Sequence, residues 1–265
     1  MITLLDGAMG TELLARGVDL SGRAWSARAI REAPQVVSAI HADYATAGAT
    51  IHTAATFRTR PGDAGQDWER LARRAVDLAR GHGRVAGSIA PIADCYRPDL
   101  SAPDAWVQHR YFAAVLADAG CDLLLCETFA HPGEAAFAVA AAVATGLETW
   151  AALTPGPDGR LLSPSELGNA AAEALNAGAS AVLVNCVAAD LAGAYLRRLS
   201  PLGVPFGCYA NAGPIGGPLG WGAGGGPERY AVIATRWLDE GATLVGGCCG
   251  TSPAHIRTLA RHCGL

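Results

Sequence analysis

The sequence predicts a (β/α)8 barrel, and three observations support this prediction. Eight β-like runs alternate with helical segments along 265 residues, which matches both the number of units and the length of this fold. Several runs, such as 123–125 and 181–184, are continuously apolar, as expected for parallel strands buried on both faces. The first run leads into 6–11, Asp-Gly-Ala-Met-Gly-Thr, which lacks the GxGxxG spacing of the competing doubly wound sheet. We expect one barrel domain over 1–265.

Glycine marks the boundaries between many of the predicted helices and strands. Gly48, Gly120, Gly178 and Gly241 each follow an Ala or Glu at the end of a helical segment, where a left-handed residue turns the chain into the next strand. The predicted strands are 2–6, 50–53, 85–89, 122–127, 149–154, 181–186, 205–210 and 243–247.

The helical segments are indicated by apolar residues that recur every three or four positions. Pro34 suits a first helical turn, and apolar residues follow it at these spacings. Trp68 begins a second such pattern, through Leu71 and Leu78. The segment 163–166, Ser-Pro-Ser-Glu, indicates the start of another helix, with an Ala-rich stretch behind it.

Composition excludes several functions and partners. All 20 basic side chains are arginines, so chemistry that needs a lysine amine is absent, including Schiff bases and the P-loop lysine. The net charge of −4 gives no basic surface for nucleic acid. The N-terminus lacks the pattern of a signal peptide, and the apolar stretch 174–189 is too short and polar to span a bilayer. We therefore expect a cytoplasmic protein with neither a nucleic-acid nor a membrane partner.

Three of the eight cysteines are expected to meet at one end of the barrel. Cys186 ends the sixth predicted strand, and Cys248 and Cys249 follow the eighth. The carboxyl ends of barrel strands lie on one face, so the three thiolates could converge on a Zn2+ ion and leave a fourth position open. The alternative is that they are small buried apolar residues, which is how we interpret Cys121, Cys126, Cys208 and Cys263; Cys95 lies in a loop and is assigned no function.

A zinc ion held by three thiolates indicates chemistry on a substrate thiol. Coordination deprotonates a thiol outright, whereas a free thiol is largely protonated at neutral pH. The sequence therefore favours alkyl transfer onto a thiol. The alternative from another class is a zinc-bound or redox-responsive binding protein without turnover, which would use the Cys248–Cys249 pair.

Other side chains at the predicted strand ends suit a small substrate. Asp6 ends the first strand and Glu127 the fourth, and a carboxylate suits an ammonium group; alternatively they cap turns or pair with arginine. Thr53 could add a hydrogen bond or be an ordinary loop hydroxyl. Trp25 could face a cationic methyl donor or pack between helices. His41, like His52 and His255, is assigned no ligand role.

The motifs resemble those of the homocysteine S-methyltransferase family nearly end to end. The segment 25–27, Trp-Ser-Ala, is most similar to the branch that uses S-methylmethionine or S-adenosylmethionine. The matching segments are 5–13, 16–20, 25–27, 41–44, 47–49, 87–91, Cys126-Glu127-Thr128, Asn185-Cys186, Tyr209-Ala210-Asn211 and Gly246-Gly247-Cys248-Cys249-Gly250-Thr251-Ser252-Pro253.

The resemblance implies a zinc-dependent barrel that methylates homocysteine to methionine. It implies that the three cysteines are the metal ligands, that Asp6 and Glu127 line the homocysteine site, and that Glu127 contacts the amino group. Thr128 and Asn185 lie in the same motifs and are further expected substrate-binding residues. We infer no oligomeric state from the sequence.

One segment departs from the family pattern. After the seventh strand the family usually reads Asn-Ser-Gly-Glu, whereas this chain reads Asn-Ala-Gly-Pro over 211–214. The glycine-rich segment 213–227 that follows is either a surface loop or a lid over the barrel mouth. The departure leaves open another thiol or selenol acceptor, or a betaine-type donor.

Overall fold

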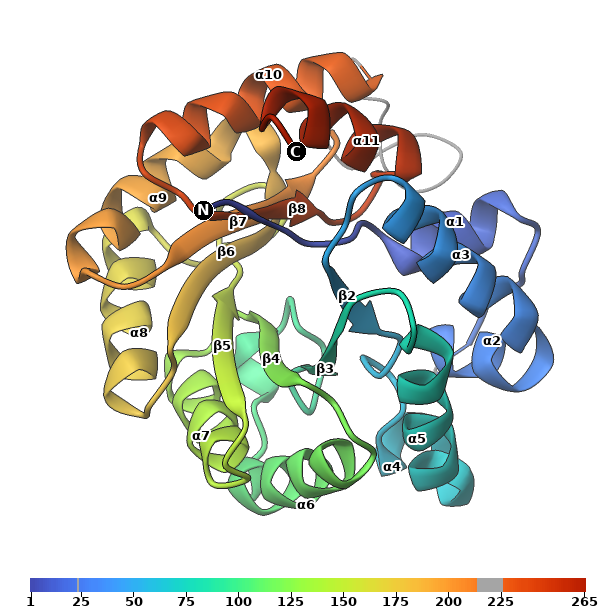
Figure 1. Cartoon of the computed structure of the whole chain (residues 1–265). Coiled ribbons are helices and arrows are strands. Elements are labelled where there is room, and N and C mark those ends of the chain that lie inside the picture. Colours follow the sequence, from blue (N-terminus) through green and yellow to red (C-terminus); the bar gives the residue numbers. More distant parts are fainter. Residues whose placement is uncertain (23, 214–225) are drawn as a thin grey trace.

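The computed structural model describes residues 1–22, 24–213 and 226–265 and forms an eight-stranded parallel barrel. Each strand pairs with its neighbour in the sheet, and a bridge between Leu5 and Ile51 brings the first strand to the second (Figure 1). The strands are β1 (Thr3–Leu4), β2 (Ile51–Ala54), β3 (Arg84–Ile89), β4 (Leu123–Phe129), β5 (Glu148–Leu153), β6 (Ala181–Ala188), β7 (Phe206–Asn211) and β8 (Leu244–Gly247).

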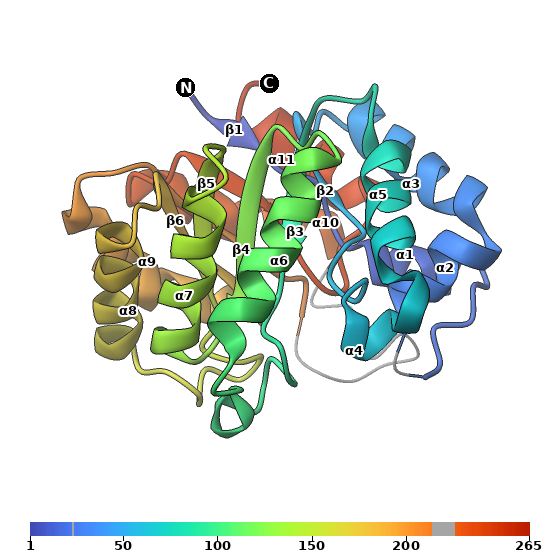
Figure 2. The ribbon, with the colours of Figure 1, turned by 90° about the horizontal axis from the view of Figure 1, so that it is seen from below.

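Helices surround the barrel as an outer ring, and both termini lie at the end where the strands begin (Figures 1 and 2). No helix within the described ranges is both long and apolar enough to cross a membrane. The glycine-rich segment 213–227, expected to be either a surface loop or a lid, lies mostly outside the described residues. The helices are α1 (Met9–Ala15), α2 (Ser26–Glu32), α3 (Pro34–Thr46), α4 (Pro61–Ala64), α5 (Trp68–Ala79), α6 (Ala105–Asp118), α7 (Pro132–Val143), α8 (Pro164–Asn176), α9 (Ala192–Leu199), α10 (Gly226–Asp239) and α11 (Pro253–His262).

The predicted helix boundaries are confirmed. Helix α3 begins at Pro34, and α5 begins at Trp68, each with its predicted apolar side chains buried. Helix α8 begins with a capping box, in which Ser163 and Glu166 exchange hydrogen bonds between side chain and backbone. The four glycines expected at helix ends all have positive φ angles.

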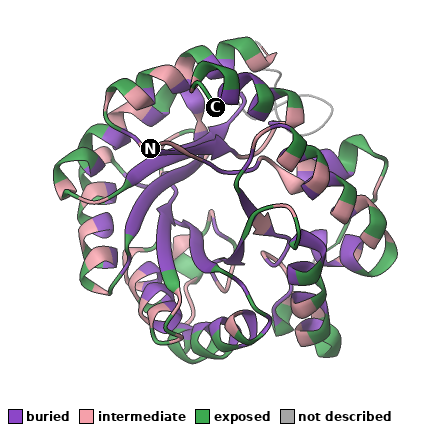
Figure 3. Cartoon of the chain, in the orientation of Figure 1, coloured by how far each residue is buried: buried purple, intermediate pink, exposed green. Residues whose placement is uncertain are grey.

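The strands are mostly buried (Figure 3), and their side chains alternate between two apolar clusters. Leu123 and Leu125 belong to the cluster inside the barrel, whereas Leu124 and Cys126 pack outward against the helices. Strands β7 and β8 approach closely at Gly207, where an added Cβ atom would lie 1.7 Å from the backbone oxygen of Leu244. Buried strands therefore fix the positions of the loops at their carboxyl ends.

Candidate active site

A cavity of about 830 Å3 lies at the carboxyl ends of the strands. Asn185 is not among the described residues that line it; this side chain is fully buried below the cavity. The other predicted site residues all line the cavity, namely Asp6, Trp25, Thr53, Glu127, Thr128, Cys186, Cys248 and Cys249.

The three predicted cysteines come together at this cavity. Their Sγ atoms all lie within 4.8 Å of one another. The Sγ atoms of Cys248 and Cys249 are 3.9 Å apart, close to the edge of about 3.8 Å that a tetrahedral site with Zn–S bonds of about 2.3 Å requires. Cys186 and Cys248 are closer, at 2.7 Å, so an ion would move these two sulfurs apart by about 1 Å. The three thiols fit a soft, sulfur-preferring metal ion.

An irregularity in β6 directs Cys186 into the cavity. Leu183 faces the barrel interior and Val184 faces the helices, so strict alternation would turn Asn185 inward and Cys186 outward. Instead, Cys186 has a φ angle of 52°, and the pairing register shifts between Asn185 and Ala188. The prediction that Cys186 ends its strand is therefore wrong in detail, because β6 continues to Ala188.

Strand β4 has a matching irregularity beside Glu127. Thr128 has a φ angle of 64°, the register shifts between Glu127 and Phe129, and the strand continues two residues past its predicted end. The Asn185 side-chain amide donates a hydrogen bond to the Thr128 hydroxyl at 2.8 Å, and Thr128 lies 4.0 Å from the Cys186 sulfur. Thr128 of β4 thus links the Asn185 side chain to the Cys186 sulfur.

The loop after β8 holds the other two cysteines through its backbone. The Cys248 amide donates to Ala210 at 2.8 Å, and the Cys249 carbonyl accepts from Ala212 at 2.9 Å. Thr251 folds back to donate to the Cys248 carbonyl at 2.7 Å. A Cβ atom on Gly247 would lie 2.4 Å from the Thr251 hydroxyl, so this turn requires glycine there.

The environment of the thiols favours their protonated forms. The hydrogen bond with Cys248 and then burial raise the pKa of Cys186 well above its usual range, although the hydrogen bond with Cys249 opposes the shift. The hydrogen bond with Cys186 and burial raise the pKa of Cys249 in the same way. A bound cation would reverse this preference, because metal ligation requires thiolates.

Glu127 is held inside the barrel by two hydroxyl groups. The Tyr209 hydroxyl donates to one carboxylate oxygen at 2.9 Å, and the Ser88 hydroxyl donates to the other. Burial raises the pKa of Glu127, and these two hydrogen bonds oppose the shift. The sequence did not assign either residue a role, although both lie in the family motifs quoted above.

Asp6 also lines the cavity and is buried. The Thr53 backbone amide donates to its Oδ2 atom at 2.9 Å. Burial raises the pKa of Asp6 to about 8; hydrogen bonds from Thr53 oppose this, and the charge of Glu127 adds to it. Thr53 therefore acts on Asp6 chiefly through its backbone.

Trp25 both packs and faces the cavity. Its ring meets Phe57 edge-on with centroids 6.2 Å apart, and it covers Gly10, where a Cβ atom would lie 2.3 Å from the indole. Trp25 has a φ angle of 37° at the start of α2 and lines the cavity. Trp25 therefore packs against neighbouring residues and also lines the cavity.

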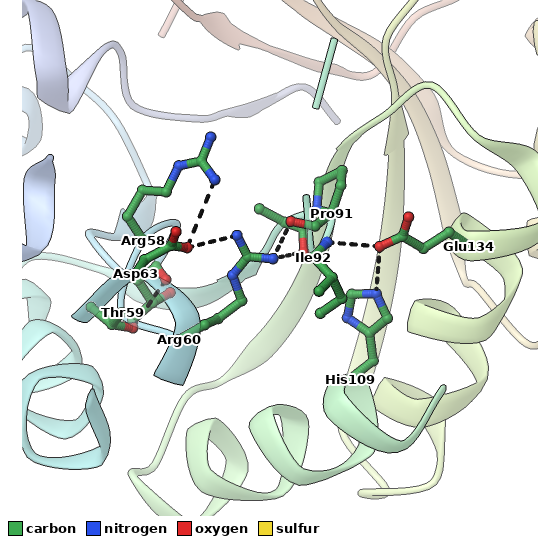
Figure 4. A network of polar contacts seen from close by, with 10 residues as sticks. Arg58, Thr59, Arg60, Asp63, Pro91, Ile92, His109 and Glu134 are labelled. Atoms are coloured by element: carbon green, nitrogen blue, oxygen red, sulfur yellow. Dashed lines mark hydrogen bonds and ion pairs between the residues drawn. The ribbon is translucent and has the colours of Figure 1, made fainter. Parts of the chain in front are cut away.

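A buried arginine ties two loops of the cavity wall together (Figure 4). Arg60, only 4% exposed, donates to Asp63 at 2.8 Å and to the backbone carbonyls of Ala90 and Pro91. Arg58, which lines the cavity, lies 3.7 Å from the same Asp63 carboxylate. The loops after β2 and β3 are therefore fixed to each other.

Helices α6 and α7 hold the loop after β3 from the outer side (Figure 4). Glu134 accepts from the Ile92 backbone amide at 2.7 Å and contacts the His109 ring at 3.1 Å. These contacts position the segment that carries Cys95 and Tyr96, both of which line the cavity. The sequence contains no indication of these contacts, because Ile92, His109 and Glu134 are far apart along the chain.

Fold and site together define a (β/α)8-barrel enzyme with a three-cysteine centre at its mouth. The model of the homocysteine S-methyltransferase family matches residues 3–263. The homocysteine S-methyltransferase of Escherichia coli (strain K12) is 34% identical, over 97% of this chain and 94% of its own length. The chain therefore belongs to the homocysteine S-methyltransferase family and is a methyltransferase, which confirms the resemblance and argues against a binding protein without turnover.

Solved structures and other relatives support the same family assignment. The crystal structure of the metallated form of the homocysteine methyltransferase MmuM from Escherichia coli matches with a TM-score of 0.84 and 31% identity, covering 98% of this chain and 96% of that one. A selenocysteine methyltransferase from Astragalus bisulcatus is 26% identical, over 97% of this chain and 90% of its own length. The family thus includes relatives named for both sulfur and selenium acceptors.

Proposed function

We propose that this chain transfers a methyl group from a sulfonium donor, S-methylmethionine or S-adenosylmethionine, to homocysteine, giving methionine. The observation that carries the proposal is that three cysteine sulfurs and a buried carboxylate face one cavity. The cysteines suit a zinc ion, and the carboxylate suits the ammonium group of an amino acid.

The side chains of this site would divide the work of binding. Cys186, Cys248 and Cys249 would hold Zn2+, whose charge lowers the pKa of an acceptor thiol. Glu127, positioned by its two hydroxyl partners, would bind the acceptor's ammonium group, and Asp6 would add a second carboxylate.

The reaction itself needs alignment more than acid–base catalysis. The acceptor sulfur forms a bond to the methyl carbon as the bond from that carbon to the donor sulfonium breaks. The donor leaves as a neutral thioether, and the acceptor's thiol proton goes to solvent. Trp25 would meet the positive donor through its aromatic face. Holding both substrates in line supplies much of the rate.

Activity measurements with a matched pair of variants test the proposal. Methionine would be measured by mass spectrometry after incubation of homocysteine with S-methylmethionine, S-adenosylmethionine or betaine, alongside the bound metal. Cys186→Ser should lose both zinc and activity, whereas Cys121→Ser, a buried cysteine outside the cavity, should retain both. A Cys186→Ser protein with the zinc content and the activity of wild type would refute the proposal.

The carboxylate role has its own test. Glu127→Gln should lower kcat/KM for homocysteine by about 10- to 100-fold, the range expected for a lost charge-assisted hydrogen bond. It should have little effect with 4-mercaptobutanoic acid, which lacks the amino group. Equal losses with both acceptors would show that Glu127 does not bind the ammonium group.

A selenol acceptor is the second candidate, because two relatives are named as selenocysteine methyltransferases. Selenocysteine has an ammonium group as homocysteine does, with a shorter side chain. Competition between the two acceptors in one reaction, with both methylated products measured, would give the ratio of their kcat/KM values directly.

A further inference from the structure

A second cluster of metal-ligating side chains lies behind the cavity. Asp6, His41 and His52 each offer one ligand atom, and these atoms lie within 4.8 Å of one another. Ile51 belongs to the apolar cluster inside the barrel, so His52, next along β2, faces the helices, where it meets His41 of α3. Asp6 lines the cavity but neither histidine does, so the cluster shares one residue with the cavity wall and shares no ligand with the cysteine centre.

Both histidines are buried without hydrogen-bond partners. Each is fully inaccessible to solvent, and none of the four ring nitrogens makes a hydrogen bond to another described residue. The Nδ1 atom of His41 is 4.0 Å from Oδ2 of Asp6, too far for a hydrogen bond. Each unpaired buried group costs about 1–3 kcal/mol. The three side chains therefore lie close together without bonding to one another.

The spacing of the rings suits a shared ion. The centroids of His41 and His52 are 5.9 Å apart, and the ring planes are inclined at 75°. A ring centroid lies about 3 Å from a zinc ion bound through nitrogen, so two rings on one ion have centroids no more than about 6 Å apart. Burial lowers the pKa of His41 to about 3, with smaller contributions from His52 and His82, so its ring is neutral, the form that binds metals.

We propose that Asp6, His41 and His52 bind a second divalent metal ion, of the first-row type that imidazole ligands prefer, such as zinc, cobalt or nickel. The carboxylate would partly neutralise the ion. The backbone carbonyls of Ala49 and His82 lie near the His52 ring but outside hydrogen-bond geometry, and one of them would accept a proton from the nitrogen that does not face the ion. The half-buried His82, 6.0 Å from His52 between ring centroids, marks a route from the surface.

Such an ion would connect the outer layer of the barrel to the active site. It would join helix α3 to strand β2 and to the residue after β1. It would also hold Asp6 in its charged form beside the acceptor site. The two centres would differ in their ligand atoms, sulfur in one and nitrogen with oxygen in the other, and this difference can be measured.

Cobalt titration of the full-length, metal-stripped protein separates the two centres. Co2+ bound by thiolates gives intense sulfur-to-metal charge-transfer absorption in the near ultraviolet, whereas Co2+ bound by imidazole and carboxylate gives only weak visible bands. We expect two equivalents of Co2+ to bind per chain. Only one of the two should give the charge-transfer absorption. Saturation at one equivalent, or charge transfer from both, would overturn the proposal without any variant.

Variants then assign the second ion. His52→Gln and His41→Gln should each bind one equivalent and retain the charge-transfer band. His109→Gln removes an equally buried histidine at a different place and should still bind two. Cys248→Ser should lose the charge-transfer band and keep the weak visible bands. Two equivalents in both His41→Gln and His52→Gln would place the second ion elsewhere and refute the site.

Discussion

Asp6 should make the folded protein less stable as the pH rises, and Asp6→Asn should remove this effect. The folded protein holds the Asp6 proton up to a pKa of about 8, whereas an unfolded aspartate loses its proton near pH 4. Between these values unfolding releases a proton. Because the unfolded chain binds fewer protons than the folded one, the free energy of unfolding falls as pH rises.

The size of this pH dependence follows from the raised pKa of Asp6. One proton released on unfolding corresponds to about 1.4 kcal/mol for each pH unit, so Asp6 should lower the free energy of unfolding by about 3 kcal/mol between about pH 5 and about pH 7. Other titrating groups contribute in both proteins. The difference between wild type and Asp6→Asn isolates the contribution of Asp6.

Urea unfolding at a series of pH values measures this difference. The experiment uses protein stripped of metal and kept reduced, since cations near Asp6 or oxidised cysteines would change the reference state. The free energy of unfolding of wild type should fall relative to Asp6→Asn as pH rises, with unchanged m-values. If the two proteins show the same dependence on pH, the Asp6 carboxyl is already ionised in the folded state and the reasoning is refuted.

Three further substitutions test other parts of the structure. Tyr209→Phe removes a hydrogen bond that lowers the pKa of Glu127, so the pH at which kcat/KM rises should move upward, and an unmoved profile would contradict this. Gly207→Ala should destabilise the protein by about 3 kcal/mol in urea unfolding, because the new methyl group meets strand backbone, whereas Gly62→Ala, in open space, should change stability by less than about 1 kcal/mol. Asp63→Ala should lower the free energy of unfolding by about 3 kcal/mol by leaving its buried arginine partner without a counter-charge; a loss below about 1 kcal/mol would show that the backbone carbonyls suffice.

Local patterns predicted the fold well. All eight strands occur within two residues of their predicted ends, because continuous apolar runs and helix-ending glycines are encoded locally. The first strand is much shorter than predicted: 2–6 was expected, but only Thr3–Leu4 pairs with β8, and Leu5 joins β2 through a single bridge. Barrel closure decides how much of this run is hydrogen-bonded as a strand, and closure depends on residues distant in sequence.

The inward direction of Cys186 could not be predicted from alternation. Counting along β6 turns this side chain away from the cavity, and only its left-handed backbone returns it. Residues other than glycine rarely adopt such angles, so no local pattern indicates them. Thr128 makes the same exception on β4, and the contact between the two shows that each irregularity supports the other. Such strain is stored where surrounding structure fixes it.

The pKa values of the acidic groups in the site also depend on closure of the barrel. Ser88 and Tyr209 reach Glu127 from strands that are 39 and 82 residues away along the chain. Burial then raises the pKa of Glu127 and Asp6, as it helps to raise that of the Cys186 thiol. A bound cation favours the deprotonated form of such groups, because their raised pKa values reflect the cost of burying a negative charge. Binding of a metal ion to the thiols is therefore expected to release protons and to tighten as pH rises.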